Sequence, residues 1–296
     1  MLPVIFALAI ALPQPPANAA LAARVSQLFE NFEAGDDDQA AHKTAKDDVQ
    51  EFIAKRGLLT VADVGDETSY TIAMLACETA ALGERDSLIV KLRTAAAKHD
   101  IPADAVTYCE IHTKQDRVKA AAMRRPPTKP ALREQINRLF ARDQAPRAGG
   151  SLDAEAFEKT DRELREPLEQ IFVRYGVPTY AAVGPEASSQ FAIMIQHQPP
   201  DFRRKVLPKL KANVDAGQGD AGVYAMMYDR AATDEGRSQR YGENFTCDSE
   251  HPEMHPYPIE DEAHVDNRRA ALGKVRLALQ TQMMKKFYGA SPCRRP

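Results

Sequence analysis

The chain has 296 residues, 44 % of them hydrophobic, which is enough for two domains that each bury a core of their own. Its formal net charge is −3, and its lysines and arginines are spread along the chain. This argues against a general nucleic-acid-binding protein, which usually carries a basic face, and the composition predicts a soluble mature protein.

Residues 1–19 predict a signal peptide. Residues 1–12 are uncharged and almost wholly apolar, a run of about the length of a signal h-region and too short to span a bilayer. Prolines follow, and Ala17-Asn18-Ala19 has the small-x-small pattern that signal peptidase cleaves. Because no Lys or Arg precedes the run, a mis-assigned start or a buried N-terminal helix is the alternative. We expect a periplasmic or extracellular protein without stable membrane insertion after cleavage.

Two segments of the chain resemble each other at a constant offset of 119 residues. Residues 57–73 read GLLTVADVGDETSYTIA and residues 176–192 read GVPTYAAVGPEASSQFA, with eight of the seventeen positions identical and no gap. Because the glycines stay in register, the pattern predicts one structural unit used twice. Helical spacing of apolar residues precedes Gly57 and Gly176, and each glycine suits the C′ position of a helix.

The repeat predicts a mainly α fold with two related helical modules. Three prolines within residues 126–130 form the expected linker between a degenerate N-terminal module, 20–125, and a C-terminal module, 131–296. The four cysteines lie two in each module and lack the C-x-x-C spacing of zinc sites. In an oxidising compartment, pairing within modules predicts disulfides Cys77–Cys109 and Cys247–Cys293, with free buried thiols as the alternative.

The C-terminal module continues with helical spacing as far as residue 232. A helix is expected from Pro185, which suits a first turn, to about His197, and others over 207–214 and 223–232. Residues 237–246 then predict a short extended or hairpin segment, and residues 248–258 a proline-rich loop. Asp266 is expected to cap one final helix, in which Leu272, Val275, Leu279 and Met283 share a face.

The order and spacing of short motifs over residues 131–288 resemble an uncharacterised bacterial family, a domain of unknown function. Two positions depart from it, since Val177 stands where a Trp is usual and Glu243-Asn244 where Thr-Gln is usual. The resemblance implies a site in this module and no particular activity. The motifs are G-x-P-T at 176–179, V-G at 183–184, Q-H at 196–197, D-R at 229–230, G-R-x-Q-R-Y-G at 236–242, P-I-E-D at 258–261 and V-D-x-R-R at 265–269.

His197 is the sharpest candidate for chemistry. It ends a predicted helix, where an imidazole could act as general base or acid near neutral pH, or could be a hydrogen-bonded core residue favoured by the helix C-terminus. Asp229 is the candidate that would hold His197 in one tautomer, as the orienting half of a catalytic dyad. Alternatively, Asp229 and Arg230 belong to buried ion pairs that fix the register between helices.

The predicted binding residues lie around this histidine and in the C-terminal motifs. Gln239 and Tyr241 share one side of an extended segment and together could recognise an amide or a sugar hydroxyl, although the tyrosine could instead pack on the helices. His251 and His255 are a weak metal signal, because nearby prolines prevent the helix that would align them. We expect no metal and no cofactor. The remaining predicted binding residues are Gln196, Arg230, Asp266 and Arg269.

Two functions fit these observations. The first is an exported ligand-binding or structural envelope protein, whose partner would be a small ligand, a glycan or a peptide; it is favoured because no nucleophile or metal motif is visible. The second is a hydrolase-like enzyme with an acid–base site centred on His197. The two differ in one expectation: an enzyme would gather His197, Asp229 and the C-terminal polar residues in one open cleft, whereas a structural network would be buried and mutually satisfied.

Overall fold

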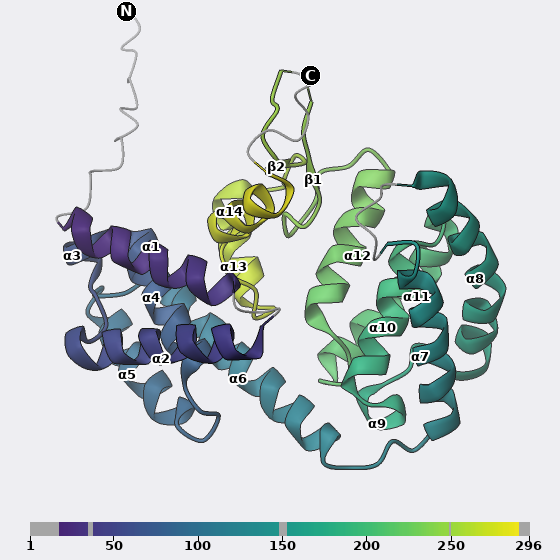
Figure 1. Ribbon diagram of the computed structural model, residues 1–296, viewed down its shortest axis with the longest axis horizontal. Helices are drawn as coiled ribbons and strands as arrows, with labels where there is room; N and C mark the ends of the chain where they lie inside the picture. The colour runs from purple at the N-terminus through teal and green to yellow at the C-terminus, as the bar shows by residue number, and fades with distance from the viewer. Residues whose placement is uncertain (1–17, 35–37, 148–152, 249, 290–296) are drawn as a thin grey trace, which may run out of the picture. The chain divides into compact units, whose positions relative to one another are not determined.

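The computed structural model describes residues 18–34, 38–147, 153–248 and 250–289. Over these residues the fold is mainly α, as predicted, and its only sheet is one antiparallel pair of two-residue strands, β1 (Phe245–Thr246) and β2 (His255–Pro256) (Figure 1). The chain divides into two compact units, residues 1–106 and 107–296. The division falls within the continuous helix α6 (Ala103–Met123), upstream of the proline-rich segment where the sequence places a linker.

The N-terminal unit is built on three helices that pack on one another, namely α1, α2 and α4. Val25, Leu59, Val64 and Ile72 form a buried cluster there, and α4 is buried over most of its length. The elements are α1 (Ala19–Ala34), α2 (Gln39–Arg56), α3 (Val61–Val64), α4 (Asp66–Thr79), α5 (Arg85–Ala97) and the start of α6.

The cysteines follow the predicted pairing as far as they are described. Cys77 in α4 and Cys109 in α6 are fully buried and lie at disulfide distance. Cys247 is also disulfide-bonded. Its predicted partner, Cys293, lies outside the described residues, as do residues 1–17 of the predicted signal peptide.

The C-terminal unit places α10 at its centre, packed against α7, α9, α11 and α12 (Figure 1). Phe191, Met194 and Ile195 of α10 are fully buried and belong to one continuous core. The elements after α6 are α7 (Pro130–Gln144), α8 (Ala154–Tyr175), α9 (Tyr180–Val183), α10 (Pro185–Gln196), α11 (Pro200–Asp215), α12 (Ala221–Asp234), β1, β2, the 3-10 turn η1 (Glu262–His264), α13 (Val265–Ala270) and α14 (Leu277–Tyr288).

Glycines end the helices at equivalent positions of the two similar segments, 57–73 and 176–192. Gly57 and Gly176 follow α2 and α8 with φ of 75° and 70°, and the N–H of each bonds back to the preceding helix. Gly65 and Gly184 separate the short helices α3 and α9 from the helices that follow, with φ of 82° and 86°. Positive φ is accessible to glycine at little cost, which explains the conserved register of these four residues between the two segments.

Hydroxyl side chains repeat as faithfully as the glycines. Thr60 and Thr179 are the N-caps of α3 and α9, and each side chain accepts a backbone N–H three residues on. Ser69 and Ser188 are buried, and each Oγ donates to the carbonyl ten residues earlier, over 2.9 Å and 2.7 Å respectively. The two segments therefore share local geometry as well as sequence.

A second correspondence joins α1 to α7, at an offset of 111 residues. The apolar stripe of α1 runs through Val25, Leu28 and Phe29, and that of α7 through Ile136, Leu139 and Phe140. At the next position of the stripe α1 has the buried Phe32, whereas α7 has the buried Asp143. The apolar face of α1 thus ends in a phenylalanine, whereas the equivalent face of α7 ends in a carboxylate.

Two expectations for the C-terminal region are corrected. The single final helix is wrong: α13 ends at Ala270, Gly273 adopts φ of 67°, and α14 begins at Leu277. Asp266 does not cap α13; its carboxylate accepts the N–H of Leu277 at 2.8 Å, in the first turn of α14. The predicted loop 248–258 also contains a strand, because His255–Pro256 pairs with Phe245–Thr246.

Candidate functional site

His197 lies at the C-terminal end of α10 and contacts a buried carboxylate. Its Nδ1 is 2.9 Å from Oδ1 of Asp143, in the last turn of α7. The side chain of Asp143 is fully buried, whereas that of His197 is 26 % exposed. A carboxylate that accepts the Nδ1 proton leaves the lone pair of a neutral imidazole on Nε2. No side chain or backbone group in the described part of the chain bonds to Nε2.

Arg147 and Asp161 complete this cluster. Arg147, in the turn after α7, lies 2.8 Å from a carboxylate oxygen of Asp161 in α8 and 3.4 Å from Oδ1 of Asp143. Gln144 donates to the other oxygen of Asp143 at 2.6 Å. Both oxygens of Asp143 are therefore occupied by donors, which keeps the carboxylate in place beside the imidazole. We call Asp143, Arg147, Asp161 and His197 the His197 cluster.

The donor atoms of Asp143, Asp161 and His197 lie within 4.8 Å of one another, a spacing that a metal ion could bridge. Arg147 already supplies the positive charge between the two carboxylates. A divalent cation would have to displace that guanidinium from both aspartates and break the contact between His197 and Asp143. The geometry therefore fits an oriented imidazole better than a metal centre.

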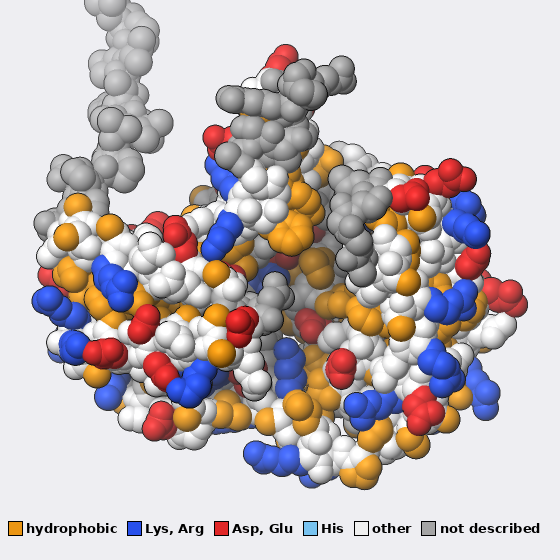
Figure 2. Space-filling view, viewed as in Figure 1, with side chains coloured by type: hydrophobic (Ala, Val, Ile, Leu, Met, Phe, Trp, Pro, Cys, Tyr) orange, Lys and Arg blue, Asp and Glu red, His pale blue; other side chains and the backbone are white. Residues whose placement is uncertain are grey.

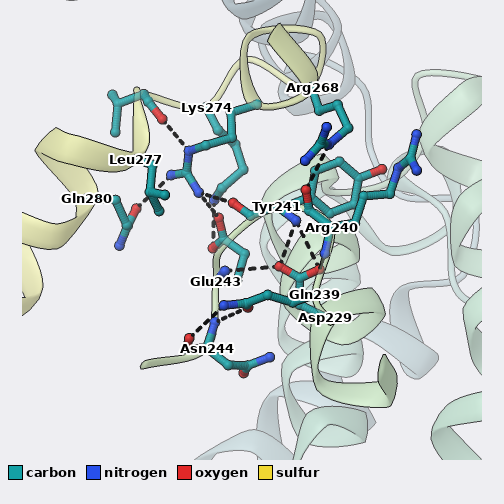
Figure 3. A network of polar contacts seen from close by, with 12 residues as sticks. Asp229, Gln239, Arg240, Tyr241, Glu243, Asn244, Arg268, Lys274, Leu277 and Gln280 are labelled. Atoms are coloured by element: carbon teal, nitrogen blue, oxygen red, sulfur yellow. Dashed lines mark hydrogen bonds and ion pairs between the residues drawn. The ribbon is translucent and has the colours of Figure 1, made fainter. Parts of the chain in front are cut away.

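Asp229, the predicted partner of His197, serves another purpose. Its carboxylate is fully buried and accepts the backbone N–H groups of Arg240, Tyr241 and Glu243 at 2.7–3.1 Å (Figure 3). Burial raises the pKa of this carboxyl, and the three N–H bonds oppose that rise. The predicted dyad of Asp229 with His197 is wrong: Asp143 occupies that place, and Asp229 shapes the chain at 240–243.

The other C-terminal candidates belong to the same network as Asp229. Gln239 is fully buried, and its amide bonds to the backbone of Asn244 and Tyr257 (Figure 3). Tyr241 is buried against Tyr224 and Tyr228. Gln239 and Tyr241 are thus both buried: the amide of Gln239 bonds to backbone groups, and the ring of Tyr241 packs on two other tyrosines. This arrangement is typical of residues that stabilise the fold and do not bind a ligand.

Arg269 is the largest fully buried side chain of the chain's described part. It lies 2.8 Å from a carboxylate oxygen of Glu243 and donates to the carbonyls of Tyr241 and Val275. Lys274 approaches the other oxygen of Glu243 at 3.1 Å. Because each charge is matched inside the fold, this part of the predicted binding set is mutually satisfied.

The side chains of the last predicted residues bond to neither cluster, although Gln196 directly precedes His197 in the chain. Gln196 donates to the carbonyl of Val223 at 3.3 Å, and Arg230 is 56 % exposed and lies 3.6 Å from Asp234 in its own helix. His251 and His255 are near each other, with ring centroids 5.7 Å apart. The Nδ1 of His255 faces the carbonyl of Glu253 at 3.0 Å.

The sequence singled out His197 as a candidate but did not indicate its contacts with Asp143, Arg147 and Asp161. One signal was available: Leu132, Ile136, Leu139 and Asp143 follow helical spacing, so a carboxylate stands on an apolar stripe. A buried carboxylate requires partners, and those partners come from helices distant in sequence.

The distribution of charged side chains and the apolar character of the helices describe the molecule further. Lys and Arg side chains alternate with Asp and Glu over the face in Figure 2. Within the described ranges, none of the helices combines the length and the apolar character needed to cross a membrane.

Comparison with known proteins gives a family and nothing finer. The model of a family of unknown function, DUF6624, matches residues 128–291. This range contains the His197 cluster and the network of Asp229, Gln239, Tyr241, Glu243, Asn244, Arg269 and Lys274, which we call the Asp229 network, and it leaves out the N-terminal unit. No curated protein sequence and no solved structure matches the chain.

Proposed function

The chain belongs to the DUF6624 family of unknown function, and we propose that its C-terminal unit carries a hydrolase-like acid–base site in which His197 is the base and Asp143 orients it. One observation supports this above all: Nδ1 of His197 lies 2.9 Å from a fully buried carboxylate. Nε2 has no partner in the described chain. A structural histidine at a helix end gains little from leaving one ring nitrogen unused.

In the proposed mechanism the Nε2 lone pair of His197 takes a proton from a bound water molecule or a substrate hydroxyl. Asp143 stabilises the imidazolium that forms and keeps the ring in one tautomer. Arg147 and Asp161, which pair with each other at 2.8 Å in the same cluster, are the charged groups that we expect to hydrogen-bond the reacting groups. Because the chain shows no nucleophile motif, water is the expected nucleophile.

Ligand binding without turnover is the second candidate. A partly exposed imidazole whose Nε2 has no partner among the described residues suits a hydrogen bond from a small ligand, a glycan or a peptide as well as it suits proton transfer. The Asp229 network does not support either candidate, since the carboxylates of Asp229 and Glu243 and the guanidinium of Arg269 all have partners inside the fold. A ligand would therefore contact the His197 cluster.

We further propose that the N-terminal unit is a diverged copy without this site. Its support is the shared geometry of the two glycine-rich segments, together with Phe32 where α7 has Asp143 and Glu78 where α10 has His197. An apolar side chain in place of the orienting carboxylate removes the means of fixing an imidazole. The N-terminal unit is then a structural module.

Export is also a proposal. Its support is the disulfide pairing of Cys77 with Cys109 and the disulfide at Cys247, because such bonds persist mainly in oxidising compartments.

The test compares two histidine–aspartate pairs in the same protein. Hydrolysis of chromogenic esters, glycosides and anilides is measured for wild type, His197→Ala and His264→Ala, with thermal melting against envelope sugars and peptides alongside. His264 is the matched control, because its Nδ1 is 2.8 Å from Asp261 but both side chains are exposed. We expect His197→Ala alone to abolish turnover or ligand stabilisation. Equal loss in both variants, or full activity in His197→Ala, would refute the proposal.

A further inference from the structure

A buried arginine, Arg203, bonds to the backbone on both sides of His197. Arg203 lies in the first turn of α11 and is 5 % exposed. Its Nη1 donates to the carbonyl of Gln196, at 3.1 Å, and to the carbonyl of Gln198. These two carbonyls belong to the residues immediately before and after His197. Its Nη2 pairs with the carboxylate of Asp234, at the end of α12.

The same turn is tied to the aspartate side of the His197 cluster. Gln198 is fully buried, and its Nε2 donates to the backbone carbonyl of Asp161 at 3.0 Å. Carbonyls at the end of a helix lack partners within the helix, and a cation near them is favourable. Through Arg203 and Gln198, the backbone at His197 is fixed to α8, α11 and α12 at once.

Stability alone does not explain the contacts of Arg203 and Gln198. Nε of Arg203 and Oε1 of Gln198 are buried without a hydrogen-bond partner in the described chain. Burying a charged side chain costs desolvation free energy, and an unmatched polar atom adds to that cost. An arginine retained under these conditions is better explained by the geometry that it imposes. That geometry is the orientation of two peptide carbonyls on either side of the catalytic candidate.

We propose that Arg203 is a positioning residue for His197. By holding both flanking carbonyls it sets the direction of the imidazole toward Asp143, so that Nδ1 meets the carboxylate and Nε2 is left for the reacting group. Arg203 does not itself touch the reacting atoms. The inference rests on the proposed function, because it assigns Arg203 to the site built around His197.

The test follows the Nδ1–H proton of His197 by NMR, with the signal assigned by its loss in His197→Gln. We expect a slowly exchanging Nδ1–H in the wild-type protein, its loss in Arg203→Met, and its retention in Arg204→Met. Arg204 is the matched control because it is the next residue and forms an exposed pair with Glu235, 3.7 Å away. Arg203→Met and Arg204→Met each lose one positive charge, so a change confined to Arg203→Met reflects the position of Arg203.

A second readout measures carbethoxylation of His197 by peptide mass, with the exposed His264 as internal reference. We expect the rate at His197 to change in Arg203→Met and to stay at the wild-type value in Arg204→Met. Should Arg203→Met fail to fold, Arg203→Lys decides, because an ammonium keeps the charge but lacks the fork that spans two carbonyls. It should weaken the Nδ1–H signal without removing it.

The outcomes separate the two proposals. A folded Arg203→Met, or failing that a folded Arg203→Lys, whose His197 signal and modification rate equal those of wild type overturns the positioning role and leaves the acid–base site standing. Absence of a protected Nδ1–H in the wild-type protein overturns the acid–base site, and the positioning role with it.

Discussion

Replacing Asp143 by asparagine removes the charge that orients His197 and keeps the shape of the side chain. Three side-chain donors approach this carboxylate: Nδ1 of His197 at 2.9 Å, Nε2 of Gln144 at 2.6 Å and a guanidinium nitrogen of Arg147 at 3.4 Å. Asparagine has one acceptor oxygen and one NH₂ group. Either the Gln144 amide turns over to accept from the new NH₂ group, or one of the three donors faces another donor.

The cost can be bounded from the contacts. A hydrogen bond to a charged group contributes about 1.5–3 kcal/mol, whereas breaking a buried ion pair outright costs about 3–5 kcal/mol. The larger value does not apply, because Arg147 keeps Asp161 at 2.8 Å and His197 is 26 % exposed to water. We expect Asp143→Asn to lower the free energy of unfolding by about 2 kcal/mol.

The measurement is urea unfolding followed by circular dichroism, with Phe191→Ala as the reference. Phe191 is fully buried in the core around α10, so its truncation should cost about 3–5 kcal/mol. Asp143→Asn should cost less than Phe191→Ala, yet lose the His197 Nδ1–H signal and any turnover, which Phe191→Ala retains while folded. If the signal survives in Asp143→Asn, Asp143 does not orient the ring and the reasoning is wrong.

Four further predictions concern the disulfides, Asp229, Asp201 and the N-terminus. Non-reducing peptide mapping should find Cys77–Cys109 and Cys247–Cys293, each stabilising the fold by about 2–4 kcal/mol; a bond joining Cys77 to Cys247 would contradict the pairing. Asp229→Asn should destabilise the fold by about 2 kcal/mol and leave the His197 signal unchanged, whereas a changed signal would link the two clusters. The hydrogen bond from Arg165 holds the pKa of Asp201 below its usual range. The folded-state pKa is thus lower than the unfolded value, so the stabilisation is present above the unfolded pKa and lost as the pH falls through the folded one. Melting temperatures should accordingly favour wild type over Asp201→Asn near neutral pH and converge in acid; a constant difference would contradict this. Finally, intact mass of envelope-fraction protein should show cleavage after Ala19, and a retained Met1 would exclude it.

Local backbone chemistry was predictable from the sequence. Gly57 and Gly176 end helices because a positive φ is needed there, and Pro185 occupies the first turn of α10 because it lacks an N–H to lose. These features depend on a few neighbouring residues. The position of His197 at the end of an apolar helix was predictable for the same reason, whereas its role stays a prediction.

Pairing between helices was not predictable. Asp143 lies 54 residues from His197 in sequence, and periodicity shows which face of a helix is buried without showing what it meets. Asp229 looked like the natural partner of His197. Its carboxylate instead satisfies backbone N–H groups of the turn at 240–243, whose geometry no spacing pattern revealed.

If the two units are copies and the proposed site is real, the difference between Phe32 and Asp143 on matching helix faces separates two kinds of selection within a single polypeptide. If the units are copies, substitutions tolerated around Phe32 report what the helical scaffold alone requires. Substitutions tolerated around Asp143 report the scaffold and the site together. In a deep mutational scan of this chain, the N-terminal unit would therefore serve as the reference without a site. The difference between the mutational profiles of the two units would identify the residues needed for chemistry without an alignment of other proteins.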